Sequence, residues 1–428
     1  MQIKLKKALL DSQYFKYIYQ LAIGSFLAQI ITVIVAPLMT RLYAPEEIGI
    51  YTLILTVVTI FGPVLCGKYD QAIVAAEDEK EVVQLIVGSI FFSFTFLVLI
   101  TIGFKIYLSN NLQITDEVGG FAYLVIGVLF LTVFVNILTA YNNRYKEFKI
   151  ISSVTVTRTL AQNVGVLVFG LLKFGSIGLL LSQLLGMLVG FKRQGKHLYR
   201  NRIQLKEVNF TGIKNSLIKY KDLPKFSMPA HFINTAAYSI LNFFIIDLFG
   251  LVIFGFYAIS YRILGLPLNL ISMNVSKVFF QRAFEENKLL GNYRSSLKII
   301  SLFLLCLSIP MVILLFIMGP FVFRLVFGGS WNEAGVYVQI LSPMYGLRFI
   351  VSALAPALII SGKQKAEFYI SNLFIVASVV SYMICKLMGC DIYTFLTIIT
   401  ATYSLIYIIF YLYIYKLSKG ISVKAIRE

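Results

Sequence analysis

The sequence predicts an all-helical integral membrane protein, with about twelve transmembrane helices in two six-helix lobes. Three observations carry this prediction: the apolar composition, the placement of basic residues, and an internal repeat. Of the 428 residues, 58% are hydrophobic and only 14% are charged, whereas a soluble domain is roughly half apolar and a quarter charged. Lipid is therefore the expected surrounding for most of the chain.

The apolar segments are long enough to cross a bilayer. A membrane-spanning helix needs about 20 predominantly apolar residues, and the sequence contains twelve such candidates, of which the sixth is short. Their approximate bounds are 18–40, 48–66, 82–104, 119–140, 150–172, 176–191, 226–246, 251–275, 297–317, 336–360, 369–386 and 392–415.

The basic residues predict the orientation of these spans. The net charge of +18 would suggest a nucleic-acid partner in a soluble protein, but here the basic residues gather in alternate loops. Thirty of the 38 Lys and Arg residues lie before the first span, in every second loop and in the tail, against five in the other loops. Because cytoplasmic loops collect positive charge, both termini are predicted to be cytoplasmic.

An internal repeat predicts two equivalent lobes. The segment "RLYAPEEIGIY" at 41–51 aligns with "DLFGLVIFGFY" at 247–257, and "AAEDEK" at 75–80 aligns with "AFEENK" at 283–288. Each repeat contains six spans. Because six is an even number, both repeats begin on the same side of the membrane, and a pseudo-two-fold axis along the membrane normal relates them, as in two-lobed transporters. The predicted domains are a first lobe at 1–191, a basic cytoplasmic connector at 192–225 and a second lobe at 226–428. We expect the connector to lie on anionic membrane lipids.

Three arginines lie near the centres of predicted spans: Arg158, Arg262 and Arg348. An arginine at this depth costs roughly 2.5–3.5 kcal/mol on insertion scales, and no acidic residue lies near the centre of any span. A wet cavity that receives an anionic substrate would offset this cost, since the planar guanidinium binds phosphate through two parallel hydrogen bonds. The three arginines are therefore predicted to bind substrate. The structural alternative is that they brace neighbouring helices.

Polar residues at helical spacing extend this prediction. Asn269 follows Arg262 on one face of its span, in a stripe that continues through Ser272 and Ser276. Asn234 and Asn242 share a face of the preceding span, and Gln29 lies on the equivalent stripe of the first span. We predict that the side chains of Asn269, Asn234, Asn242 and Gln29 also contact substrate. Stripes of this kind equally serve helix–helix hydrogen bonding, so that alternative stays open.

Titratable residues that could couple transport to an ion gradient are few. Asp70 and Asp247 lie at span ends and His231 lies within a predicted span, and these three are the candidates. The structural alternatives are an ion pair of Asp70 with Lys68 or with a neighbouring loop, and a hydrogen-bonded, structural His231.

The sequence shows no signature of a catalytic or cofactor site. The four cysteines lack metal-ligand spacing, and the Gly-Lys pairs at 67–68 and 362–363 lack the remainder of a phosphate loop. We therefore expect that the protein is not an enzyme and that it binds no metal or cofactor.

Three segments resemble a known family: "APLMTRLYAPEEIGIYTL" at 36–53, "GKYDQAIVAAEDEKE" at 67–81 and "GGSWNEAGVYVQILSPMYGLRFIVSAL" at 328–354. They are similar to bacterial polysaccharide transporters, the Wzx-type oligosaccharide flippases of the multidrug/oligosaccharidyl-lipid/polysaccharide (MATE-like) superfamily. The resemblance implies a flippase in the cytoplasmic (inner) membrane. Such a flippase moves undecaprenyl-diphosphate-linked oligosaccharide units for O-antigen, capsule or exopolysaccharide to the outer leaflet by alternating access.

Partners and rival functions follow from the same resemblance. A polysaccharide polymerase and its chain-length machinery are the expected protein partners. The alternatives are a multidrug exporter of the same superfamily and a membrane-embedded glycosyltransferase or polymerase. The usual cationic substrates of a drug exporter would need a carboxylate in mid-membrane, and a transferase or polymerase would need a large extramembrane loop with clustered acids. The sequence offers neither.

Overall fold

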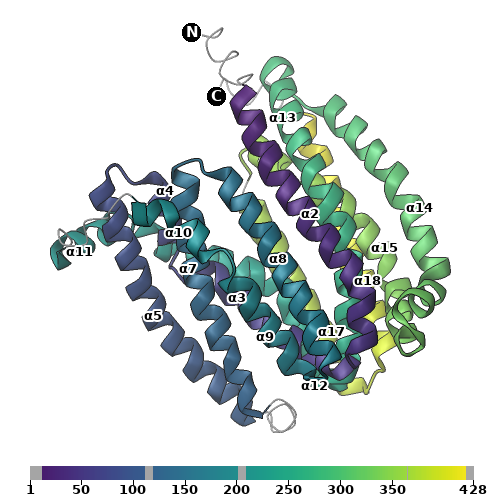
Figure 1. Ribbon diagram of the computed structural model, residues 1–428. Helices are drawn as coiled ribbons and strands as arrows, with labels where there is room; N and C mark the ends of the chain where they lie inside the picture. The colour runs from purple at the N-terminus through teal and green to yellow at the C-terminus, as the bar shows by residue number, and fades with distance from the viewer. Residues whose placement is uncertain (1–11, 111–118, 201–208, 364, 421–428) are drawn as a thin grey trace. The chain divides into compact units, whose positions relative to one another are not determined.

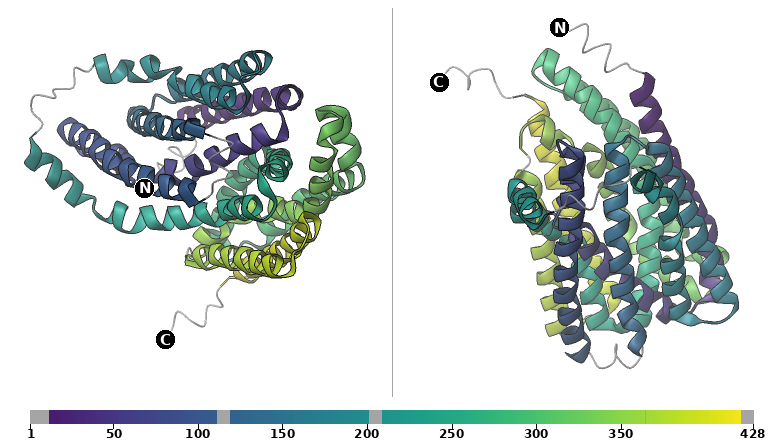
Figure 2. Two further views of the ribbon diagram at one scale, coloured as in Figure 1. Left: turned by 90° about the horizontal axis from the view of Figure 1, so that it is seen from below. Right: turned by 60° about the vertical axis from the view of Figure 1, so that its left-hand side comes forward.

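The computed structural model describes residues 12–110, 119–200, 209–363 and 365–420, and within these ranges every regular element is a helix. The predicted all-helical class is confirmed. The chain divides into two compact units, Met1–Thr235 and Ala236–Glu428, and within each unit the long helices lie side by side as a bundle (Figures 1 and 2).

Unit 1 contains the helices of the first predicted lobe together with the described part of the predicted connector. Its helices are α2 (Ser12–Leu42), α3 (Pro45–Phe61), α4 (Tyr69–Ala75), α5 (Glu79–Asn110), α7 (Leu124–Arg144), α8 (Phe148–Leu171), α9 (Gly175–Leu188), α10 (Phe191–Arg200) and α11 (Phe210–Lys219). Because α11 packs on α5, the second half of the connector belongs to unit 1. Residues 201–208, at the middle of the connector, lie outside the described ranges.

Small residues allow the helices of unit 1 to approach closely. Helix α2 packs along α8, which in turn packs along α9. A methyl group added at Gly24 of α2 would stand 2.2 Å from the Ser152 hydroxyl, and one at Gly165 would stand 3.0 Å from the Ser182 hydroxyl. Glycine and serine at contact points are typical of membrane bundles, where close backbone packing replaces the hydrophobic effect between helices.

Unit 2 contains the remaining helices. These are α12 (Met228–Pro267, whose first eight residues belong to unit 1), α13 (Met273–Leu290), α14 (Arg294–Phe327), α15 (Asn332–Leu354), the single turn α16 (Ala357–Ile360), α17 (Lys365–Met388) and α18 (Ile392–Ser418). Helix α15 packs against α14 and α18 and is the most buried long helix of this unit.

The described helices provide eleven stretches that are long and apolar enough to cross a membrane. One of them, Ser239–Leu290, has 52 residues, which at 1.5 Å per residue is more than twice the thickness of a hydrocarbon core. It is interrupted at Gly250, whose φ of 80° and ψ of 178° are not helical, at the predicted loop between the seventh and eighth spans. When this interrupted stretch is counted as two crossings, the eleven stretches agree with the predicted twelve crossings.

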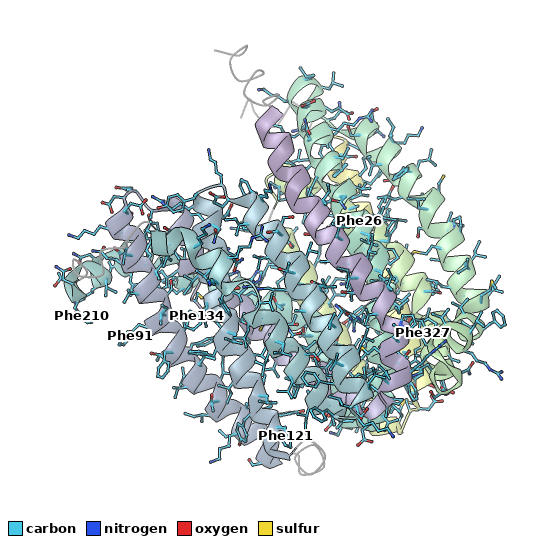
Figure 3. The ribbon with its side chains drawn as sticks, in the orientation of Figure 1. Phe26, Phe91, Phe121, Phe134, Phe210 and Phe327 are labelled. Atoms are coloured by element: carbon cyan, nitrogen blue, oxygen red, sulfur yellow. The ribbon has the colours of Figure 1, made fainter. Side chains whose placement is uncertain are left out.

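The outer surface of the bundles is apolar. Phe91 on α5 is 75% exposed and Phe26 on α2 is 47% exposed, and Figure 3 shows Phe91 on the outer side of its helix. Large apolar side chains exposed over whole helices are unusual in soluble proteins. They fit a multi-pass membrane protein whose helices face lipid.

Candidate substrate-binding site

Unit 2 contains a cavity of about 460 Å³ that opens among α13, α15, α17 and α18. Its polar lining includes Arg348 and Ser352 from α15 and Glu367 from α17. Ser272, from the turn before α13, and Ser276, from the first turn of α13, also line it. Lys277 also borders it, while Tyr407 and Phe410 of α18 give it an apolar wall. The volume lies within the range of small-molecule sites.

A break in the helix preceding α13 shapes one wall of the cavity. Pro267 ends α12, since proline lacks the N–H that an α-helix needs, and a π-helical turn follows over Leu268–Ser272. The buried Ser272 hydroxyl donates to the Phe349 carbonyl oxygen at 2.9 Å and lies 2.7 Å from the Ser352 hydroxyl. These contacts fix the wide turn to α15. Single π-helical turns inside helices are frequently found at functional sites.

Arg348 lies on the α15 side of the cavity, between aromatic rings. Its guanidinium carbon is 5.4 Å from the centre of the Tyr345 ring and 5.9 Å from that of Tyr261. Tyr345 is 2% exposed, whereas Arg348 is half-buried. The rings stabilise and orient the cation through their negative faces. The site thus presents a positioned guanidinium beside several hydroxyl groups, which suits an anion that also carries hydrogen-bonding groups.

Arg262 does not border this cavity. It is half-buried on α12, five residues before Pro267, and the π-helical turn after Pro267 separates it from Ser272 and Ser276. The predicted stripe assumed a regular α-helix from Arg262 to Ser276, and the wider turn shifts that register. The predicted contact of Arg262 with substrate stays a prediction.

Arg158 has partners within unit 1. Its Nε donates to the Val189 carbonyl oxygen at 3.0 Å and its Nη2 donates to Gln194 Oε1 at 2.9 Å. The guanidinium also lies 5.4 Å from the Phe191 ring centre. Helix α9 ends at Leu188, although the stretch that is long enough to cross a membrane continues to Lys196. The Val189 carbonyl oxygen lies just past this helix end, and Arg158 donates a hydrogen bond to it. These contacts are those of a bracing residue, the structural alternative.

The other predicted polar contacts are distributed over both units. Gln29 on α2 and Asn234 at the start of α12 are half-buried in unit 1, and Asn242 is half-buried in unit 2. The side chain of Asn269 lies outside the described residues. None of the three described side chains borders the cavity of unit 2, and their contact with substrate stays a prediction.

The three titratable candidates have different surroundings. Asp247 is 46% exposed at its side chain and pairs with Lys386 at 2.9 Å, with the Tyr382 hydroxyl donating at 2.7 Å. His231 is exposed in unit 1. Asp70 is the most enclosed of the three, with its Oδ1 atom buried and without a hydrogen-bond partner in the described part of the chain.

The comparisons with known proteins bear on these features. The model of the family described as polysaccharide biosynthesis protein matches residues 38–336, well over half of the chain. The chain belongs to this family. Comparison with curated protein sequences finds no match.

Solved structures show the fold of this family member. The lipid II flippase MurJ in an inward closed conformation is similar over 94% of this chain and 88% of its own, with a TM-score of 0.71 and 13% identity. A multidrug resistance MATE transporter of the MOP superfamily, in an inward-facing conformation, is similar over 93% and 98%, with a TM-score of 0.65 and 16% identity. At these identities the likeness establishes a MATE-like transporter fold, which confirms the predicted fold class. Both of these solved structures belong to proteins that are named as a transporter or a flippase.

One feature of this family member was missed in the sequence: the anchoring of α11. Lys219 pairs with Glu77 at 2.9 Å and with Glu81 at 2.7 Å, and the buried Ser216 hydroxyl donates to Gln84 Oε1 at 2.7 Å. The acidic run "AEDEKE" at 76–81 contributes to the internal repeat and to the family resemblance. Its complementarity to the basic connector was the signal that could have predicted this contact.

Proposed function

We propose that this protein is a flippase that moves undecaprenyl-diphosphate-linked oligosaccharide units from the cytoplasmic to the outer leaflet by alternating access. The units would serve O-antigen, capsule or exopolysaccharide synthesis. The cavity of unit 2 receives the anionic part of the substrate, with Arg348 as the main contact for the diphosphate. Arg262 is a second contact for the substrate in this proposal, at a position that does not border the cavity of unit 2. Arg158 instead braces the end of α9.

One observation carries the proposal: Arg348 borders a cavity of about 460 Å³ beside Ser272, Ser276 and Ser352. A guanidinium binds a phosphate-type oxyanion with fixed geometry, and hydroxyl groups suit the hydroxyls of sugars. Membership of the polysaccharide biosynthesis family and the MATE-like fold support the same function. Glu367 at the cavity edge disfavours an anion on its own, but Lys277 offsets its charge.

The location and partners follow from this function. A polyprenyl-linked substrate is made on the cytoplasmic face, so the protein would lie in the bacterial cytoplasmic (inner) membrane with both termini cytoplasmic. A polysaccharide polymerase with its chain-length machinery would receive the translocated units. The anionic lipids of the inner leaflet would contact the basic connector.

Substitution of Arg348 tests the proposal. Losing a hydrogen bond to a charged group costs about 1.5–3 kcal/mol, and each 1.4 kcal/mol is a factor of about ten. Arg348→Ala is therefore expected to lower export of surface polysaccharide about tenfold or more at normal membrane abundance. Arg348→Lys keeps the charge and loses less, and Arg348→Glu repels the diphosphate and loses most. The measurement is complementation of a deletion strain, normalised to the amount of protein in the membrane.

The control is Arg324→Ala, which removes an exposed arginine of the same unit at the end of α14. It is expected to leave export unchanged. Full complementation by Arg348→Glu at normal abundance would refute the assigned anion site. Normal amounts of inner-leaflet lipid-linked units in the deletion strain would refute the flippase function itself.

A further inference from the structure

Unit 1 contains a helix break that the cavity of unit 2 does not explain. Helix α3 ends at Phe61, a 3₁₀ turn covers Gly62–Val64, and the backbone then turns left-handed at Gly67 (φ 58°) and Lys68 (φ 63°) before α4 begins at Tyr69. Glycine adopts this conformation readily, but lysine does so at a cost because its Cβ crowds the backbone. The break thus places a charged side chain at a strained position.

Lys68 is enclosed at this break. Only 7% of the residue is exposed, and no carboxylate lies within 4.0 Å of its ammonium group in the described ranges. The direct ion pair with Lys68, one structural alternative for Asp70, is therefore not formed there. A largely buried ammonium group without a paired carboxylate is unfavourable. Burial lowers the pKa of Lys68, and the nearby Asp70 counteracts this.

Asp70 is the complementary group. Desolvation raises the pKa of its carboxyl, while Lys68 and the N–H groups of Asp70 and Gln71 at the start of α4 lower it. Its Oδ1 is buried and has no hydrogen-bond partner among the described residues. Such a carboxylate is stable in two ways: by binding a proton, or by gaining a cationic partner.

In the described part of the chain, no charged side chain other than Lys68 acts strongly on the Asp70 carboxyl. Cys66 and Tyr69 flank it on its own segment, and α5 faces Cys66 with the Ser93 hydroxyl. Lys68 also acts electrostatically on His231, which lies at the start of α12. Arg144 of α7 instead donates to carbonyl groups at the other end of α4, including those of Ile73 and Ala76. Lys68 is therefore the cation that favours the charged form of the Asp70 carboxyl, against the effect of burial.

We propose that Asp70 is a proton-binding site of the transport cycle and that Lys68 is the partner its carboxylate takes when the proton leaves. The inference rests on the proposed transport function and names its coupling ion. Deprotonation releases one proton from the Asp70 carboxyl to water, while Lys68 remains an ammonium throughout. The resulting attraction shortens the gap between the two side chains and changes the helix break, as in transporters that place ion sites at interrupted helices.

Infrared difference spectroscopy of the purified full-length protein during a pH titration tests the pair directly. We expect a carboxyl band that disappears above the usual pH range of aspartate and is absent from Asp70→Asn. In Lys68→Gln the midpoint of this band moves to higher pH, since the nearby positive charge is gone. The control Lys219→Gln removes an exposed lysine of the same unit, paired with Glu77 and Glu81, and leaves the midpoint unchanged.

Two results would overturn the inference. One is a midpoint that Lys68→Gln does not move, which would show that the two groups are not partners. The other is export by Asp70→Asn cells that keeps the wild-type sensitivity to a protonophore, which would show that Asp70 does not couple transport to protons. The titration needs no substrate, so its outcome stands even where the Arg348 variants refute the flippase function.

Discussion

At the scale of single residues, the structure separates arginines that the sequence placed together. Arg158 and Arg348 both lie near the centre of a predicted span, and each is half-buried. Arg158 donates to Val189 and Gln194, whereas Arg348 borders a cavity. Depth in the membrane follows from hydropathy, but the neighbours of a side chain depend on where adjacent helices end. The stop of α9 at Leu188 is followed by Gly190, whose positive φ of 92° suits glycine just past a helix end. A lone glycine in an apolar span does not by itself predict a helix end, so the sequence alone did not reveal this distinction.

The bracing role of Arg158 gives a prediction that differs from that of Arg348. Arg158→Ala leaves the buried Gln194 side chain without the hydrogen bond from the guanidinium, which costs about 1–3 kcal/mol. We expect lower membrane abundance and a lower Tm in detergent, with export per folded molecule nearly unchanged. Thr157→Ala, at an exposed neighbouring position, is expected to keep the wild-type Tm. Wild-type Tm with lost export would instead return Arg158 to the substrate site.

At the scale of elements, the helix breaks are more informative than the helices. Pro267 predicts an interruption in its span, but it does not predict a π-helical turn over Leu268–Ser272 that turns Ser272 toward α15. The spacing of Ser272 and Ser276 was therefore useful, and both line the cavity, but their registration with Arg262 assumed a straight helix. The break at Gly67–Lys68 was visible only as a Gly-Lys pair.

The π-helical turn has a testable anchor. Ser272→Ala removes the hydrogen bond to the Phe349 carbonyl oxygen and the contact with Ser352, which is expected to lower stability by about 1 kcal/mol. The cavity wall loosens, so export should fall as well. Ser276→Ala is the matched control for stability alone, because Ser276 is only half-buried. It borders the same cavity, so its export is not expected to stay at the wild-type level. An unchanged Tm for Ser272→Ala would show that Pro267 alone holds the turn.

At the scale of the whole molecule, the sequence predicted the fold well, for a physical reason. Apolar spans, loop charge and repeat order are properties of long segments, and the bilayer restricts spanning structures to helices and closed barrels. The apolar length of 226–275, for example, required two crossings, and the structure breaks this stretch at Gly250. Sites such as Lys219 with Glu77 depend on pairing between distant segments, for which the sequence offers only the opposite charges of the two segments.

The orientation in the membrane is the remaining whole-molecule prediction, and it determines the direction of transport. Thirty basic residues in alternate loops place 192–225 in the cytoplasm and the loop at 318–335 outside. In a variant without native cysteines, Ser330→Cys is therefore expected to react with a membrane-impermeant thiol reagent in intact cells, with any outer membrane permeabilised. Lys214→Cys is expected to react only after lysis. Both positions are exposed, so a difference in labelling reports sidedness rather than burial. The reverse pattern would invert the topology, and a flippase would then carry its substrate toward the cytoplasm.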